Sequence, residues 1–246
     1  YEHNISIPVV EAITNTEIGP LLEGNAADKR EYFRLYSDFC KRYGYDTVPY
    51  EAAFVDLVQG GEALSGRKGA LIRDKADLQQ YPWDELPDRY STMYGEHFAA
   101  LRDTLPPGMQ AVGGVGYGIF EATQDFIPLT DLAYLEMDNP EVFTAVWERV
   151  GTAMFRIWDR LLREYGEMFA VCRSGDDLGF KSSLLIKPET VREHIIPQYS
   201  RIIELVHRHS KPFLLHSCGR IYEIMDDLID TAGIDDVGSL GEMRAR

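Results

Sequence analysis

The chain has 246 residues, 45% of them apolar and 26% charged, and 40 Asp and Glu residues outnumber 25 Lys and Arg residues for a net charge of −15. This acidic balance excludes nucleic acid and anionic membrane surfaces as main partners, because phosphate binding requires a basic face. No apolar run approaches the roughly 20 residues that span a bilayer, and residues 1–30 lack a signal-peptide pattern, so we expect a cytoplasmic globular protein.

The first half of the chain alternates helical and strand patterns. Aromatic residues spaced three or four apart predict a helix over Asp28–Tyr43, which Gly44 ends, and a strand over Asp46–Phe54 follows directly. A glycine-rich stretch, residues 60–69, is compatible with a small hairpin. Further on we expect a helix near Asp88–Thr104 and a buried strand over Met109–Gly114.

The second half continues the alternation. Its clearest helix is Asn139–Tyr165, in which Asn139 is the expected N-cap and Pro140 lies in the first turn. Pro197 predicts a kink or a break within the next helix. The remaining predicted elements are strand Met168–Cys172, helix Pro188–His209, strand Pro212–Cys218, helix Ile221–Ala232 and a final short run, Ile234–Leu240.

This alternation predicts an α/β fold in which helices connect the strands of a parallel sheet. About four to six strands can be counted if Tyr1–Ile5 is the remnant of a first one, whereas a closed (β/α)8 barrel needs eight. We therefore expect residues 1–246 to form a single TIM-like barrel domain that lacks its first residues and last strands, or else a smaller open sheet. Exposed edges of such a sheet would favour a homo-oligomer.

Several polar side chains follow the predicted strands, at the edge where parallel α/β folds bind ligands. Glu51 follows Thr47–Tyr50 in the first strand, and Tyr117 and Glu121 follow the second. We expect all three to contact substrate; the alternative for Glu51 and Glu121 is a solvated or structural role. Asp176 and Asp177 follow the third. Paired carboxylates can act as general acid and base, bind a cation or orient a metal-bound group, although one of them could instead cap the next turn.

The segment His216-Ser217-Cys218 ends the fourth predicted strand. Because strand side chains alternate, His216 and Cys218 should point to one side, where an imidazole and a thiolate form half of a tetrahedral zinc site. The alternative is a buried cysteine beside a hydrogen-bonded core histidine. Candidates for the third ligand are Cys172, the acidic residues at strand ends and a residue beyond position 246. The three cysteines are too few and too scattered for a disulfide framework, so free thiols are expected.

Four motifs between about Met168 and Asp235 form an ordered set: Gly175–Phe180, Pro188–Arg192, Lys211–Gly219 and Ile224–Ile229. Together they resemble the uroporphyrinogen decarboxylase-like superfamily, and more closely its corrinoid-linked methyltransferase branch. The resemblance is strongest in this part of the chain.

The resemblance implies a TIM-like barrel with its site at the carboxyl ends of the strands. In the methyltransferase branch the His-x-Cys element supplies two zinc ligands, which map onto His216 and Cys218, and a later strand supplies a further cysteine that this chain does not contain. The implied cofactor is zinc, the co-substrate is a methyl-corrinoid, and the implied partner is a corrinoid protein. Asp176 and Asp177 are then expected to bind substrate or position a proton.

The favoured function is therefore zinc-dependent transfer of a methyl group between a corrinoid and a small thiol or a methoxy or methylamine compound. Two alternatives stay open. One is a metal-free decarboxylase of the uroporphyrinogen type, although the Arg-Gln-Ala-Gly-Arg-type segment that marks those enzymes is absent here. The other is a non-catalytic, truncated paralogue.

Overall fold

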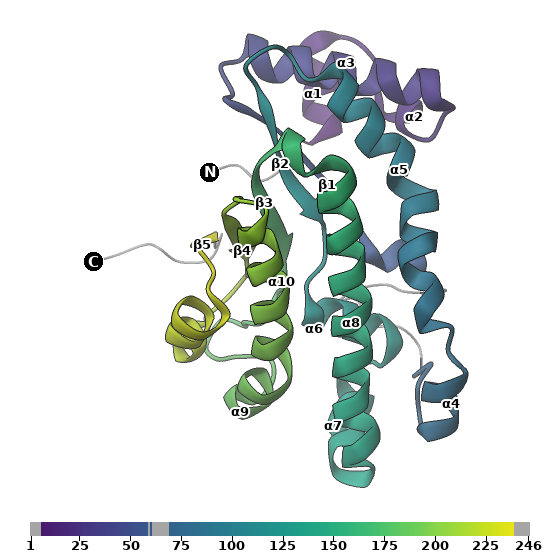
Figure 1. The fold of residues 1–246 in the computed structure, drawn as a ribbon, viewed down its shortest axis with the longest axis vertical. Helices are drawn as coiled ribbons and strands as arrows, with labels where there is room; N and C mark the ends of the chain where they lie inside the picture. Colours follow the sequence, from purple (N-terminus) through teal and green to yellow (C-terminus); the bar gives the residue numbers. More distant parts are fainter. Residues whose placement is uncertain (1–5, 59, 61–68, 239–246) are drawn as a thin grey trace.

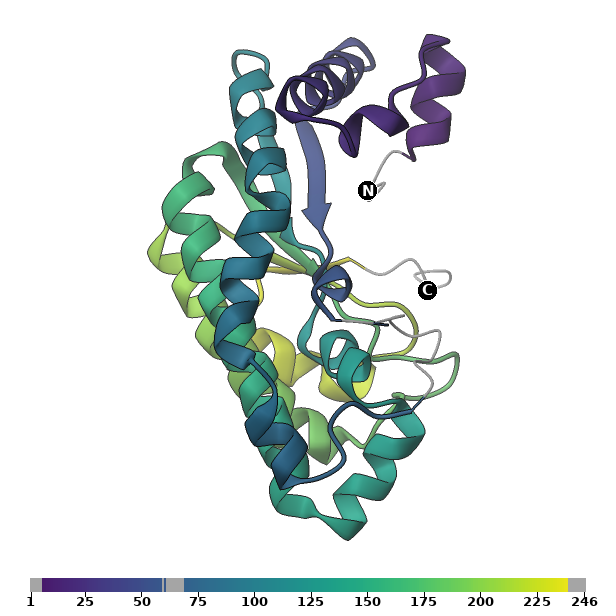
Figure 2. The same ribbon diagram turned by 90° about the vertical axis from the view of Figure 1, so that its right-hand side faces the viewer.

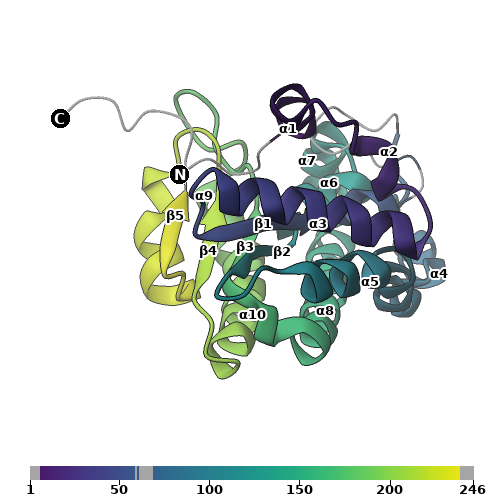
Figure 3. The ribbon, with the colours of Figure 1, turned by 90° about the horizontal axis from the view of Figure 1, so that it is seen from above.

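The computed structural model describes residues 6–58, 60 and 69–238, and within them a single sheet of five parallel strands. The order of the strands in the sheet is their order in the chain, as Figure 3 shows from above. Each strand is thus added to the same side, as in an arc of a (β/α)8 barrel, whereas a doubly wound sheet reverses direction. The strands are β1 (Thr47–Ala52), β2 (Gln110–Val115), β3 (Phe169–Gly175), β4 (Phe213–His216) and β5 (Asp236–Gly238).

Four long helices pack against one another in chain order, and three of them cover one face of this sheet. Figure 1 shows three of them, α5, α8 and α10, side by side in front of the strands. A parallel sheet covered in this way by its connecting helices confirms the predicted α/β alternation. Five of the strands needed for an eight-stranded barrel are present in the described residues, and closure remains a prediction. The four helices are α3 (Ala26–Arg42), α5 (Leu86–Thr104), α8 (Pro140–Tyr165) and α10 (Ile196–Arg208).

Contacts with these helices define the two faces of the sheet. Tyr50 of β1 packs against aromatic rings of α3 and α5, and Phe213 of β4 packs against rings of α8 and α10. Since side chains alternate along a strand, Glu51 and His216 lie on the opposite, inner face. Arg173 lies there too, because the β3 residue before it is in register with Phe213.

The carboxyl ends of the strands lie toward α6 (Ile119–Phe126), and the first three helices lie at the other end, as the arrow of β1 shows in Figure 2. The sequence patterns did not predict five of the helices, because they are too short to show several turns of periodicity. These are α1 (Ile7–Thr14), α2 (Gly19–Leu22), α4 (Lys75–Gln80), α6, and α7 (Leu129–Asp138); 3₁₀ turns span Phe54–Leu57, Trp83–Glu85 and Gly166–Met168.

The helix predicted over Pro188–His209 is interrupted, as Pro197 indicated. A short α9 (Pro188–Thr190) leads into a π-helical turn, Val191–Ile195, before α10 begins one residue ahead of the proline. Proline lacks the N–H that a continuous helix would use, and the wider turn accommodates this loss.

The single helix predicted over Ile221–Ala232 is wrong in type. The chain instead forms a 3₁₀ turn over Tyr222–Ile224 and a π-helical turn over Asp227–Ala232, which Gly233 ends in a left-handed conformation. The strand predicted at Tyr1–Ile5 and most of the hairpin predicted at residues 60–69 lie outside the described residues. Of the helices that the structure describes, none has both the length and the apolar character needed to cross a bilayer.

The start of α3 shows how local sequence sets an element. Asn25 Oδ1 accepts hydrogen bonds from the backbone N–H groups of Ala27 (2.8 Å) and Asp28 (3.3 Å), while the Asp28 carboxylate accepts from the Asn25 N–H (2.9 Å). This reciprocal capping box satisfies three donors. At α8, the predicted N-cap Asn139 is confirmed, but it accepts only one bond, from Val142, at 3.4 Å.

We expect Asn25→Ala to lower the free energy of unfolding by about 1 kcal/mol, because the first-turn donors lose their acceptor. Asn139→Ala is the matched control and should cost less, since its one capping bond is longer. Urea denaturation of both variants beside the parent measures the difference. Equal losses, or a larger loss for Asn139→Ala, would contradict the role assigned to the capping box.

Candidate metal centre

Three side chains from two neighbouring strand ends meet beyond the carboxyl edge of the sheet. Donor atoms of Asp177, His216 and Cys218 all lie within 4.8 Å of one another. His216 Nε2 lies 3.2 Å from Cys218 Sγ and 3.7 Å from Asp177 Oδ1. We call these three residues the metal cluster.

Backbone packing between two loops brings the cluster together. The loop after β3 and the loop after β4 touch through glycines: a Cβ on Gly179 would lie 2.7 Å from the Cys218 carbonyl oxygen, and one on Gly219 would lie 2.4 Å from the backbone of Gly179. Gly219 also has φ +77°, which favours glycine. The Cys218 N–H donates to Asp177 Oδ1 at 2.8 Å, so the carboxylate is held beside the thiol.

Burial affects the protonation of the two strand-end ligands, His216 and Cys218, in different ways. Burial lowers the pKa of His216, against the opposing effect of Asp177, and this favours the neutral imidazole. Burial, assisted by Asp177, raises the pKa of the Cys218 thiol to about 11, so a bound metal would have to displace its proton. One imidazole, one thiol and one carboxylate are donors that zinc prefers in tetrahedral sites with an open position.

The convergence of His216 and Cys218 is confirmed, but strand alternation is not its cause. Strand β4 ends at His216, and the turn at Gly219 brings Cys218 back toward the imidazole. Among the proposed third ligands, an acidic strand end, Asp177, is the one in the cluster. Cys172 is fully buried and in register with Phe213, on the helix-covered face, so it is wrong as a third ligand. The cysteines of the chain are free thiols, as expected.

Asp176 lies beside the cluster, with its side chain directed into the protein. Its fully buried carboxylate accepts from the N–H groups of Phe120 (3.0 Å) and Glu121 (2.9 Å), in the first turn of α6, and from the Tyr199 hydroxyl (2.7 Å). Burial raises the pKa of Asp176 to about 6, against the effect of these donors. The residue thus holds the start of α6 against the end of β3, so it caps a helix more than 50 residues earlier in the chain and not the turn that follows it, as the alternative had expected.

Glu121 is brought to the cluster through that helix start. Burial, together with the charges of Asp176 and Asp177, raises the pKa of Glu121, which favours its protonated carboxyl group. Tyr117 precedes α6, and its carbonyl accepts a hydrogen bond from Ser174 on β3 (2.8 Å). Burial and the nearby Glu121 raise the pKa of Tyr117 to about 12.

Glu51 forms a buried ion pair that the sequence patterns did not predict. Its Oε2 lies 2.5 Å from Nη1 of Arg173, across the intervening strand β2. The pair can span β2 because glycine occupies that strand where Glu51 crosses it: a Cβ on Gly113 would lie 3.2 Å from Glu51 Cγ. A single charged residue within the otherwise uncharged strand Phe169–Gly175 was the signal that could have indicated this pair.

Burial raises the pKa of Glu51 to about 7, although the Arg173 charge opposes the shift. A folded-state pKa above the unfolded value means that the folded protein binds more protons, so this group's contribution to stability falls as pH rises from about 4.5 to 7. We expect the stability of the parent relative to Glu51→Gln to fall by about 3 kcal/mol between pH 4.5 and pH 8. Urea denaturation across this range tests it, and a pH-independent difference would refute it.

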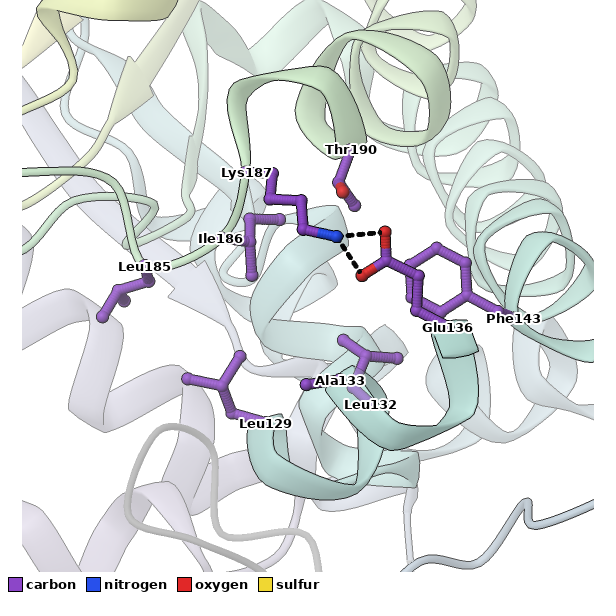
Figure 4. A pocket seen from close by; sticks show the side chains of 9 residues that line it. All are labelled: Leu129, Leu132, Ala133, Glu136, Phe143, Leu185, Ile186, Lys187 and Thr190. Carbon is purple, nitrogen blue, oxygen red and sulfur yellow. Dashed lines mark hydrogen bonds and ion pairs between the residues drawn. The ribbon is translucent and has the colours of Figure 1, made fainter. Parts of the chain in front are cut away.

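A separate apolar pocket of about 260 Å³ lies between α7, α8 and the segment before α9 (Figure 4). At this pocket, Lys187 Nζ donates hydrogen bonds to Oε1 (2.9 Å) and Oε2 (3.0 Å) of Glu136. No residue of the metal cluster lines this pocket. Its lining residues are Leu129, Leu132, Ala133, Glu136, Phe143, Leu185, Ile186, Lys187 and Thr190.

Comparison with known proteins supports the fold. No protein-family model matches the chain, and no curated protein sequence matches it either. Among solved structures, a methyltransferase from Methanosarcina mazei is similar over 96% of this chain and 68% of its own, with a TM-score of 0.66 and 15% sequence identity. At this identity the likeness shows a shared fold: the singly wound sheet and its helices are arranged as they are in that methyltransferase.

Proposed function

We propose that this protein is a zinc-dependent methyltransferase that moves a methyl group between a corrinoid and a small thiol, methoxy or methylamine substrate. The observation that carries the proposal is the metal cluster at the carboxyl edge of the sheet. The structural likeness to a methyltransferase supports the reaction class, and the motifs quoted from the sequence support the corrinoid-linked branch.

Asp177, His216 and Cys218 would hold the metal. Bound zinc would lower the pKa of a coordinated substrate thiol, so that the thiolate is available at neutral pH. The neutral imidazole of His216 can donate its Nε2 lone pair directly, whereas Cys218 must first release its proton. The carboxylate of Asp177 keeps the Cys218 backbone in place through its 2.8 Å hydrogen bond.

Glu121 lies next to the cluster, where burial and the neighbouring carboxylates raise its pKa and make it the candidate proton donor. In the direction that starts from a methoxy or methylamine donor, this group can give a proton to the oxygen or nitrogen that leaves the methyl carbon. Asp176 is a positioning residue: its carboxylate caps α6 and so fixes the position of Glu121. We propose that the substrate binds on the inner face of the sheet, beside Glu121 and the metal cluster.

A free corrinoid tests the proposal in both directions. Zinc-loaded protein should convert methylcobalamin and 2-mercaptoethanol to the thioether and cob(I)alamin, or should methylate cob(I)alamin from a methylamine donor, as followed by the corrinoid absorbance. The reaction should require both zinc and Cys218. If neither direction shows a rate that depends on zinc and on Cys218, the proposed function is refuted.

A further inference from the structure

The inner face of the sheet carries a second set of polar groups, next to the metal cluster. Glu51 on β1, Arg173 on β3 and His216 on β4 all lie on this face, opposite the helices. Two glycines, Gly116 and Gly175, lie between Glu51 and His216. A Cβ on Gly175 would lie 3.8 Å from His216 Cδ2 and 3.9 Å from the Gly116 carbonyl oxygen, and one on Gly116 would lie 3.3 Å from Glu51 Cβ.

The buried ion pair uses only part of its hydrogen-bonding capacity. Besides the contact between Oε2 and Nη1, Glu51 Oε1 and Arg173 Nε are buried and have no hydrogen-bond partner in the described part of the chain. The two side chains are only 12% and 6% exposed. Buried polar atoms of this kind are normally paired, since leaving one unpaired costs roughly 1–3 kcal/mol. A bound group or an ordered water is therefore expected here.

The charges indicate what kind of group fits. Glu51 and Arg173 neutralise each other when both are ionised, so a charged ligand end would bring an uncompensated charge into a buried position. The unused atoms are one acceptor, Oε1, and one donor, Nε–H. An uncharged group that carries one donor and one acceptor can satisfy both.

We propose that Glu51 and Arg173 form a subsite for the uncharged polar end of a small substrate, a hydroxyl or a carboxamide. The reacting end of that substrate would then extend over Gly116 and Gly175 toward the metal cluster. The inference rests on the proposed function for the identity of the reacting end. The subsite itself depends on neither zinc nor transfer, so it can be tested separately.

The Arg173 Nε–H group is a direct probe of the subsite, because a buried, slowly exchanging side-chain N–H gives its own ¹H–¹⁵N resonance. The resonance is assigned by its absence from the spectrum of the Arg173→Lys variant. At pH 8, where Glu51 is ionised, the full chain is titrated with four thiols of similar length: 2-mercaptoethanol, 1-propanethiol, cysteamine and 3-mercaptopropionate. We expect 2-mercaptoethanol to shift the resonance saturably, with an affinity at least about tenfold higher than that of the other three.

Gly175→Ala tests the path between subsite and cluster. The added methyl group would make ordinary contacts at 3.8 and 3.9 Å, and Gly175 does not have a left-handed backbone, so the variant should fold. We expect it to weaken 2-mercaptoethanol binding at least about tenfold. Gly95→Ala on α5 is the matched control: its new Cβ meets only Ser91 Oγ, at 3.9 Å, and binding should not change.

Two results would overturn the subsite. One is an Arg173 resonance that no thiol moves, or that a charged thiol or 1-propanethiol moves at equal or lower concentration. The other is Gly175→Ala binding 2-mercaptoethanol as the parent does. The zinc affinity of the same samples, measured with zinc alone, distinguishes the two proposals. If the parent protein does not bind zinc but its Arg173 Nε–H resonance still shifts with 2-mercaptoethanol, the proposed function is refuted and the subsite is supported.

Discussion

Cys218→Ala is expected to lower the zinc affinity of the protein about 100- to 1,000-fold. Structural zinc sites with four ligands bind with about 10–16 kcal/mol, so one ligand accounts for roughly 2.5–4 kcal/mol, which corresponds to this range. Cys218 Sγ lies 3.2 Å from His216 Nε2, and in the described residues no other cysteine lies within the cluster to replace it. Competition with a chromogenic chelator measures the change.

Cys172→Ala is the matched control for this loss. Cys172 is fully buried on the helix-covered face, so its replacement should cost about 1 kcal/mol of stability through a small cavity and leave zinc affinity unchanged. Equal zinc affinity of Cys218→Ala and the parent would remove Cys218 from the ligand set. A loss of zinc in Cys172→Ala, with the fold intact by circular dichroism, would show that the site lies elsewhere.

Asp176→Ala is expected to lower the free energy of unfolding by about 4–5 kcal/mol. The substitution removes the acceptor of two backbone N–H groups at the start of α6 and of the Tyr199 hydroxyl, and all three donors are left in a buried place. Each buried donor without a partner costs about 1–3 kcal/mol. Urea denaturation, with the slope checked for a two-state transition, gives the value.

Asp177→Ala separates the two carboxylates of this pair. Asp177 is partly exposed and accepts one backbone hydrogen bond, so we expect this variant to lose about 1 kcal/mol of stability. Its zinc affinity should fall, whereas Asp176→Asn should retain zinc binding if it folds. Similar stability losses in Asp176→Ala and Asp177→Ala would contradict the capping role of Asp176.

Local patterns predicted the elements whose sequences carry their own signals. The helix from Asn139 to Tyr165 has a capping residue, a proline in its first turn and an apolar stripe over seven turns, and it forms α8 with those bounds to within one residue. Short helices such as α6 have no such pattern. The start of α6 depends on Asp176, which is more than 50 residues away in the chain, and no local signal encodes that contact.

The candidate site likewise combines features that local sequence predicted with contacts that only the folded chain creates. The positions of the acidic pair and of His216-Ser217-Cys218 after neighbouring strands predicted that these residues would meet, because carboxyl ends of parallel strands share one edge. The alternation argument for His216 and Cys218 did not hold, since β4 ends at His216. Which carboxylate points outward depends on contacts that only the folded chain shows: Asp176 is held by α6 and Tyr199, and Asp177 by the Cys218 N–H. Arg173 was not predicted, since its partner Glu51 lies two strands away and the pair needs glycine in the strand between them.

The central claim is that Asp177, His216 and Cys218 together bind zinc. X-ray absorption spectroscopy at the zinc edge of the zinc-loaded parent protein tests it most directly, because sulfur and nitrogen neighbours of the metal give distinct signals. We expect one zinc per chain with one sulfur and one imidazole bound directly to it, and loss of the sulfur signal in Cys218→Ala. Zinc bound without any sulfur, or no stoichiometric zinc at all, would contradict the claim.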